Sequence, residues 1–410
     1  GYNLCWPWKL AQHRRLCLSG YMEGYAEQLA FPAKMNQDIA ALQFISRCLR
    51  NDERPESVSA LRTAIRSAQL PWEAVVNLAN DHLLTPALWV VLKRKNLSDE
   101  LPDELRDYLR ELHQLSRERN AKLQTQVLEA IRELNRIDIS PVLLKGAMHL
   151  VTDMYGDPGA RIMSDIDVLV PRDRVAECLT ALHGLGYKAD EDIHNDYHED
   201  HHHCAPLFRP GDYGSLEIHR SLTESPYADI LSTEVAFAEA QALEFQGLAM
   251  KALSPTHRLL HNILHSQLVD HNHADGIFPL RSLHEVITES RANPESVDWS
   301  DIRSRLEHHD RGEELQAYLY MAYKLFGMPF PEGTGKTFSS WLFYQRCCAQ
   351  LSWPWANEWG LRLGRYSADK MVNLSGCRND WRAINETRLR QFVRGLRTRS
   401  QCARLARHKQ

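Results

Sequence analysis

One short segment, Ser164-Asp165-Ile166-Asp167-Val168-Leu169, constrains this chain more than any other part of its sequence. The apolar residues that end it, continued by Val170, favour a buried strand. Side chains of a strand alternate between its two faces, so Asp165 and Asp167 share one face, about 6.6 Å apart along the strand. Two carboxylates held in this way, at the mouth of an apolar strand, can share divalent metal ions. We therefore expect a metal site at the edge of a buried sheet.

A second short apolar run, residues 141–144, ends in Lys145-Gly146 upstream of the two aspartates. A helix over residues 147–154 is expected to follow, and the N-terminus of a helix presents N–H groups suited to phosphate. Lys145 adds positive charge, and Gly146 lets the backbone come close to a ligand. Arg161 precedes Asp165 by four positions, where it either reaches a phosphate in the same cleft or is simply solvated at the start of the strand.

A third carboxylate usually completes a two-ion site, and Glu217 is our candidate. It lies in Leu216-Glu217-Ile218-His219, which alternates as a strand. Glu217 is expected to bind the second ion or to act as a base toward an attacking hydroxyl, with His219 on the same face to hold or orient it. The alternative is a Glu–His pair at a strand edge that faces water. Together these groups suit phosphoryl or nucleotidyl transfer, in which Mg²⁺ or Mn²⁺ neutralises triphosphate charge.

The order of patterns along the chain predicts an α+β fold. A small mixed-sheet core is expected over residues 136–253, where strand and helix patterns alternate. A helical domain, in which Trp72, Val75, Ala79 and Leu83 recur at helical spacing, is expected over residues 35–135. Helices return after the core, and the remaining boundaries are a loose extension at 1–34 and a helical region with a basic tail at 254–410.

These motifs resemble a little-characterised bacterial nucleotidyltransferase-like family of the DNA-polymerase-β-type superfamily. The resemblance spans roughly residues 36–330 and rests on Val142-Leu143-Leu144-Lys145-Gly146, Tyr155, Asp157-Pro158, Arg161, Asp165-Ile166-Asp167-Val168-Leu169-Val170 and Leu216-Glu217-Ile218-His219. It implies a nucleotidyltransferase fold with metal on Asp165, Asp167 and Glu217. It also implies binding of an NTP such as ATP near Lys145-Gly146, with Arg161, Ser164 and His219 adjoining it. The usual Gly-Ser signature of the superfamily is replaced here by Lys145-Gly146, and the third acid is Glu rather than Asp.

The expected function is therefore Mg²⁺-dependent transfer of a nucleoside monophosphate from an NTP to an acceptor hydroxyl, with release of pyrophosphate. Substituting either aspartate should abolish transfer and leave the fold intact. The acceptor is a small molecule, a protein or a tRNA, and Lys-Gly followed by Arg-x-x-Ser-Asp-x-Asp is also similar to abortive-infection toxins that add nucleotides to tRNA. A third reading is a catalytically silent descendant that binds a nucleotide or a partner protein.

Composition narrows the setting. The net charge of −4 does not mark the chain as a nucleic-acid coat protein, and no apolar stretch approaches the roughly 20 residues of a membrane helix. Nine scattered cysteines without a C-x-x-C pair favour a reducing cytoplasm. The tail at 388–409 is rich in arginine, and Arg390, Arg394 and Arg397 would share a helix face, which indicates either RNA contact or a solvated helix.

Three further patterns compete with this reading. The segment His194–Cys204 invites a zinc interpretation, but contiguous histidines are not expected to reach one ion, so a mobile polar loop near the mouth of the site is favoured, with His203 possible at the substrate. His257, His261 and His265 fall on one helix face and are expected to pack against the core rather than bind metal. Gly333–Thr337 imitates half of a phosphate-binding loop, but Phe330 stands where glycine is needed, so an ordinary loop is expected.

Overall fold

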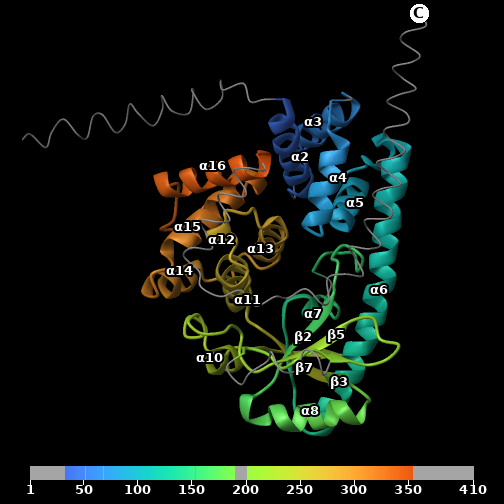
Figure 1. Ribbon diagram of the computed structural model, residues 1–410, viewed down its shortest axis with the longest axis vertical. Helices are drawn as coiled ribbons and strands as arrows, with labels where there is room; N and C mark the ends of the chain where they lie inside the picture. The colour runs from blue at the N-terminus through green and yellow to red at the C-terminus, as the bar shows by residue number, and fades with distance from the viewer. Residues whose placement is uncertain (1–32, 51, 68, 153, 190–200, 354–410) are drawn as a thin grey trace, which may run out of the picture.

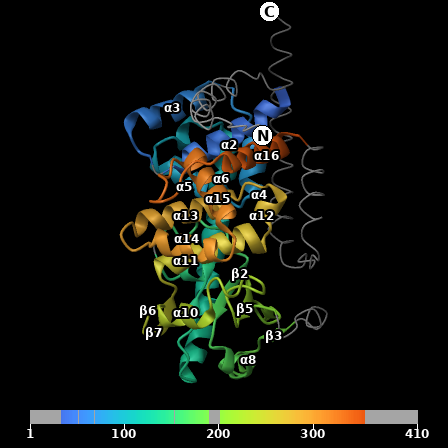
Figure 2. The same cartoon turned by 90° about the vertical axis from the view of Figure 1, so that its left-hand side faces the viewer.

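The computed structural model describes residues 33–50, 52–67, 69–152, 154–189 and 201–353 (Figure 1). Most of the extension predicted at 1–34, the greater part of the His-rich segment and the basic tail lie outside the described residues. Two parts are visible: a body of helices, and below it a sheet with its own helices (Figures 1 and 2). The predicted mixed α/β architecture is confirmed.

The sheet has seven strands in the order β3-β4-β5-β2-β1-β7-β6. Its central pairs β2–β5 and β1–β7 are parallel, and the other neighbours are antiparallel. The strands are β1 (Val142–Leu143), β2 (Asp165–Leu169), β3 (Lys188–Ala189), β4 (Leu207–Phe208), β5 (Ser215–His219), β6 (Gln241–Phe245) and β7 (Leu248–Ala252). The predicted strands at β1, β2 and β5 are confirmed, whereas the β6–β7 hairpin was not predicted.

The helix after Lys145 is shorter than predicted. α7 covers Lys145–His149 rather than running to residue 154. The side-chain amide of Gln124 donates a hydrogen bond to the carbonyl of Leu150. In a longer helix this carbonyl would accept a hydrogen bond from the backbone N–H of residue 154 instead. α8 (Val175–Gly184) and α10 (Thr233–Ala238) are the other helices of this part, together with the short turn η2 (Arg172–Arg174).

The helical body is one packed unit made from the first and the last described parts of the chain. Its core joins Leu42, Ile45 and Leu92 from the N-terminal region to Leu264, Leu283 and Tyr318 from the C-terminal region. The elements are α2 (Ala33–Leu49), α3 (Pro55–Arg66), α4 (Trp72–Asp81), α5 (Thr85–Arg94), η1 (Ser98–Glu100), α11 (Pro255–Leu264), η3 (His265–Val269), α12 (Asn272–Asp275), α13 (Leu280–Ala292), α14 (Trp299–His308), α15 (Gly312–Met321), η4 (Ala322–Phe326) and α16 (Phe338–Ser352). The two helical regions predicted from the sequence therefore share a single core.

One long helix connects the two parts. α6 (Asp103–Arg136) has 34 residues and is therefore about 51 Å long. Leu105 and Leu112, in its first half, belong to the core of the helical body, whereas Leu123 and Ile131, in its second half, belong to the core under the sheet. Figure 1 shows α6 running along one side from the helical body to the sheet. The sheet and the helical body thus both pack against α6.

Two segments singled out by the sequence take ordinary structural roles. Residues 328–337 contain neither helix nor strand, and Thr337 caps α16 by accepting a hydrogen bond from the N–H of Ser340, so the loop prediction for Gly333–Thr337 is confirmed. Within the described ranges no single helix is long and apolar enough to cross a membrane. The bent pair α4–α5, broken by 119°, passes that test when its two helices are taken together.

Candidate active site

Two neighbouring parallel strands bring the predicted acidic residues to one place. β2 and β5 pair in the register Asp165↔Ser215, Asp167↔Glu217 and Leu169↔His219. Residues in register on adjacent strands project from the same face, and residues two apart on one strand do so as well. Asp165, Asp167, Glu217 and His219 therefore lie on one face of the sheet, as the sequence pattern predicted for each strand separately.

Asp167 is the most enclosed of the acids. Its side chain is buried, with Oδ1 at 3.1 Å from Nζ of Lys145 and 2.9 Å from Nε2 of His219. Burial by itself would raise the pKa of Asp167, but the charge of Lys145 and the hydrogen bond from His219 outweigh it and hold this pKa well below the usual value. The pKa of Lys145 is raised in turn: burial opposes its charge, yet the three acids Asp167, Asp165 and Glu217 outweigh that effect. This pair is ionised at neutral pH.

Glu217 has the opposite electrostatic character. Burial, and then the charges of Asp167 and Asp165, raise its pKa from 4.5 to about 8. Its Oε2 lies 3.8 Å from Nε2 of His203 and 4.0 Å from Nε2 of His219. Three acids are thus crowded around one lysine, and Glu217 is the carboxyl that keeps its proton.

This donor set fits a divalent cation. Ligand atoms of Asp167, Glu217 and His219 all lie within 4.8 Å of one another. Carboxylate oxygens suit Mg²⁺ and Mn²⁺, and the crowding of negative charge that raises the pKa of Glu217 is the kind that a bound cation relieves. Asp165 lies beside this group at the start of β2, partly exposed, with its Oδ1 accepting a hydrogen bond of 3.1 Å from Oγ of Ser164. All the predicted acidic residues therefore line one site.

The Lys145-Gly146 turn is shaped by neighbouring side chains. Lys145 has a φ of 41°, a left-handed conformation that is strained for a residue with a side chain. A Cβ atom on Gly146 would lie 2.2 Å from Nη1 of Arg161 and 2.8 Å from Cε of Met163. A glycine at this position therefore lets Arg161 pack directly against the backbone. The close approach predicted at Gly146 was that of a ligand; the group described there is the guanidinium of Arg161.

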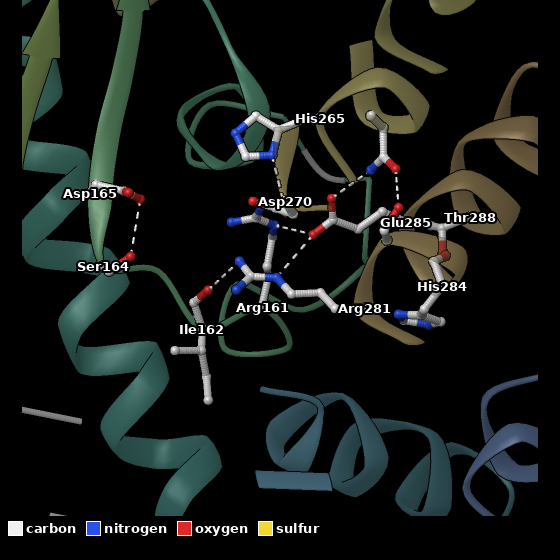
Figure 3. Close-up of polar contacts among 12 residues, drawn as sticks. Arg161, Ile162, Ser164, Asp165, His265, Asp270, Arg281, His284, Glu285 and Thr288 are labelled. Carbon is white, nitrogen blue, oxygen red and sulfur yellow. Dashed lines mark hydrogen bonds and ion pairs between the residues drawn. The ribbon is translucent and has the colours of Figure 1, made fainter. Parts of the chain in front are cut away.

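Arg161 belongs to a buried ionic network that sequence reasoning missed. Its Nε lies 3.0 Å from Oε1 of Glu285 in α13, and Nε of Arg281 lies 3.2 Å from the same oxygen (Figure 3). Arg281 also donates a hydrogen bond of 2.9 Å to the carbonyl of Ile162, in the segment that leads into β2. The carboxylate of Glu285 thus pairs with two arginines, and through them it connects α13 to the segment before β2. No local motif marks Glu285 or Arg281 in the sequence.

The histidine-rich segment is packed against β5 where the structure describes it. The N–H of Cys204 donates to the carbonyl of Ile218, and the N–H of Arg220 donates to the carbonyl of His202, both at 2.9 Å. The prediction of a mobile polar loop is therefore wrong for 202–204, which are buried because they pair with a sheet strand. Its placement next to the acidic site is right, since His203 lies beside Glu217.

The helical histidines behave as expected. His257 and His261 are buried in α11, where Nε2 of His261 lies 3.2 Å from the carbonyl of Leu222. His265 falls at the start of η3, and its Nδ1 lies 3.2 Å from Oδ2 of Asp270 (Figure 3). The packing interpretation of His257 and His261 is confirmed.

Comparison with known families agrees with this geometry. A family model described as "Uncharacterised nucleotidyltransferase" matches residues 68–327, which is more than half of the chain and includes every acid of the site. The chain belongs to this nucleotidyltransferase family. Its members are thus described by the reaction class that the paired carboxylates suggested, and residues 68–327 include parts of both the helical body and the sheet.

Comparison of this chain with individual proteins gives weaker similarities. Among solved structures it is similar to an antigenic nucleotidyltransferase-like protein from Paracoccidioides brasiliensis, at 16% identity and a TM-score of 0.27, over 50% of this chain and 97% of the other. No protein of curated function matches the chain.

The raised pKa of Glu217 predicts how the stability of this nucleotidyltransferase-family chain depends on pH. Between the ordinary pKa of 4.5 and about 8, the folded chain binds one more proton at Glu217 than the unfolded chain. The free energy of unfolding therefore falls as pH rises through this interval. Glu217→Gln removes this titration, so in EDTA the variant should gain stability relative to wild type between pH 5 and pH 8, by roughly 3–4 kcal/mol.

Urea unfolding of both proteins at several pH values measures this difference. Buried neutral histidines such as His219 titrate in both proteins and give the opposite slope below their ordinary pKa, so the comparison isolates Glu217. Parallel stability curves for the two proteins would show that Glu217 does not titrate in this interval.

Proposed function

We propose that this chain transfers a nucleoside monophosphate from an NTP to an acceptor hydroxyl, releasing pyrophosphate, with Mg²⁺ or Mn²⁺ as its metal. The observation that supports this most is the register of β2 and β5, which sets Asp167 opposite Glu217 and leaves Asp165 on the same face. Membership of a nucleotidyltransferase family supports the same reaction class.

Asp165, Asp167 and Glu217 would hold the metal. When bound, the ion would neutralise the charge of the triphosphate and help to align the attacking hydroxyl. Without a cation Glu217 keeps its proton, because burial and the neighbouring acids raise its pKa; a bound cation would favour the ionised form of this carboxyl. Glu217 then has the charge state needed to accept a proton from the acceptor hydroxyl.

Lys145 and Arg161 are proposed to steady the triphosphate, with Gly146 and Ser164 at its edge. Lys145 already lies at the acids, with Nζ 3.1 Å from Asp167, so its ammonium is positioned where phosphate oxygens would approach. His219 donates to Asp167 in the neutral form and fixes the rotamer of that carboxylate. In the reaction, the acceptor oxygen bonds to the α-phosphorus, the bond to the β-phosphate oxygen breaks, and pyrophosphate leaves with the electron pair.

We further propose that ATP is among the NTPs that bind and that the chain belongs to the DNA-polymerase-β-type superfamily. We also propose that the protein is cytoplasmic and of bacterial origin. For the acceptor, tRNA, another protein and a small molecule are distinguished by the experiment that follows. RNA contact through the basic tail belongs to the tRNA alternative.

Label transfer tests the reaction directly. The full chain is incubated with Mg²⁺ or Mn²⁺ and each α-³²P-labelled NTP in turn, together with a cell extract separated into RNA, protein and small molecules. Label should enter one fraction with the wild type and not with the Asp165→Asn/Asp167→Asn variant. The labelled fraction identifies the acceptor class, and the successful NTP identifies the base.

Two outcomes would contradict the proposal. If no NTP yields transfer while equilibrium dialysis shows that an NTP binds, the chain is a silent nucleotide-binding descendant. If label is transferred equally by the variant, the aspartates do not hold the catalytic metal.

A further inference from the structure

Three consecutive histidines gather their rings on one side of the chain. His201, His202 and His203 lie with ring centroids 4.5 to 4.7 Å apart, and each offers a ligand nitrogen within 4.8 Å of the other two. In an extended strand such neighbours would point to opposite faces. The backbone bends at His201 and His202 before pairing with β5, and this bend removes the geometric objection that contiguous histidines cannot reach one ion.

The nitrogen atoms of this cluster are arranged as those of metal ligands are. Nδ1 of His203 lies 2.8 Å from the carbonyl oxygen of Cys204, which can only accept, so Nδ1 carries the proton and Nε2 keeps its lone pair. A ring N–H donated to a backbone carbonyl is the usual support of a metal-bound histidine. His202 is more than nine-tenths buried, and its Nδ1 has no hydrogen bond within the described part of the chain.

A carboxylate lies near one member of the cluster. Oε2 of Glu224 is 3.8 Å from Nδ1 of His202. Two ligand atoms of a tetrahedral zinc ion, each about 2.1 Å from the metal, lie roughly 3.4 Å apart. The observed separation is therefore close to that of two atoms on one ion. Imidazole nitrogen favours Zn²⁺ and neighbouring transition metals over Mg²⁺, which prefers oxygen.

We propose that His201, His202 and His203, with Glu224, bind one divalent transition-metal ion, of which Zn²⁺ is the representative. This site adjoins the acidic site of Asp165, Asp167 and Glu217 but takes its nitrogen ligands from a different segment, and the inference does not depend on the proposed transferase activity. The two sites are neighbours, because His203 also lies 3.8 Å from Glu217. A metal here fixes the strand-like segment that forms one wall of the acidic site.

Metal titration of the full chain tests the proposal. Zn²⁺ affinity and stoichiometry are measured by competition with a chromophoric chelator, and Co²⁺ is added separately to record its visible absorption. Wild type should bind one ion at this site and give the intense visible bands of four-coordinate Co²⁺ with nitrogen ligands. His201→Asn/His202→Asn should lose that spectrum and weaken Zn²⁺ binding by at least about 100-fold.

Three controls distinguish loss of this metal site from loss of other histidines, from metal binding at the acidic site and from unfolding. His308→Asn/His309→Asn removes an adjacent histidine pair elsewhere, with rings 5.3 Å apart, and should bind Zn²⁺ as wild type does. Asp165→Asn, which the fold should tolerate, should also keep the ion, and if it does not, the zinc belongs to the acidic site and the proposal fails. His201→Asn alone, at the partly exposed position, replaces the double variant if circular dichroism shows the latter unfolded. Unchanged Co²⁺ spectra in the folded variant would overturn the proposal.

Discussion

Asp165→Asn is expected to reduce nucleotide transfer by at least about 1,000-fold while changing the free energy of unfolding by less than about 0.5 kcal/mol. Asp165 lies at the start of β2, partly exposed, and its side chain accepts a hydrogen bond from Ser164 that asparagine can also accept. The substitution removes one negative charge from the metal site and leaves the strand in place. Label transfer and a urea titration of the same preparation measure the two effects.

Asp167→Asn should abolish transfer as well, but at a cost in stability. Lys145 is paired with Asp167 inside the protein, and an asparagine leaves its ammonium without that partner. Breaking a buried ion pair from one side typically destabilises a protein by about 3 kcal/mol or more. The sequence-based expectation that either substitution leaves the fold intact therefore applies to Asp165 and is revised for Asp167.

A double variant separates charge from catalysis. Lys145→Met in the Asp167→Asn background removes the unpaired ammonium, so it should recover much of the lost stability without restoring transfer. If Asp165→Asn retained wild-type transfer, or Asp167→Asn were as stable as wild type, the assignment of their roles would be wrong.

Glu285→Gln should destabilise the chain by about 3–5 kcal/mol, the largest effect on stability that we expect from a single substitution. The carboxylate of Glu285 is shared by Arg161 and Arg281, and the three side chains are largely buried. The same pair of charges holds the pKa of Glu285 at about 2, although burial alone would raise it. A glutamine leaves two buried guanidinium groups without an anion.

Urea unfolding measures this cost, and Glu177→Gln is the matched control. Glu177 pairs with Arg174 at 2.5 Å on the surface, and its side chain is 47% exposed, so its loss should change stability by less than about 0.5 kcal/mol. Equal effects of the two substitutions would show that the buried network does not stabilise the fold. Because Arg281 also holds the segment before β2, the Glu285 variant should weaken NTP binding in addition.

The sequence predicted the strands of the site but not how they meet. Asp165 and Asp167 share a face because of strand periodicity, and the same argument applies to Glu217 and His219. That Asp167 lies opposite Glu217 depends on a register between strands separated by about fifty residues, which no local pattern encodes. The charge of Arg161 is evident in the sequence, but its partner Glu285 is 124 positions away, so no local pattern predicts this ion pair.

The missed hairpin has a different cause. β6 is largely exposed, so it lacks the apolar alternation that identified the inner strands. Its turn, Gln246-Gly247, has positive φ at both residues. A glycine that follows a polar residue is typical of such hairpin turns, and it is the one local feature that indicates this hairpin. For the His-rich segment, no local pattern indicates that residues 202–204 pair with β5, or that a bend at 201–202 places neighbouring rings on one side.

The core that α2 shares with α16 has a consequence for synthesis. α2 ends at Leu49, and α16, which packs against it, begins at Phe338, roughly 290 residues later. At about 5–20 residues per second, a ribosome needs some 15–60 seconds to make that interval. During this time α2 can pack against α4 and α5, but its contact with α16 cannot form. We therefore expect chaperones to bind the growing chain until α16 has been made.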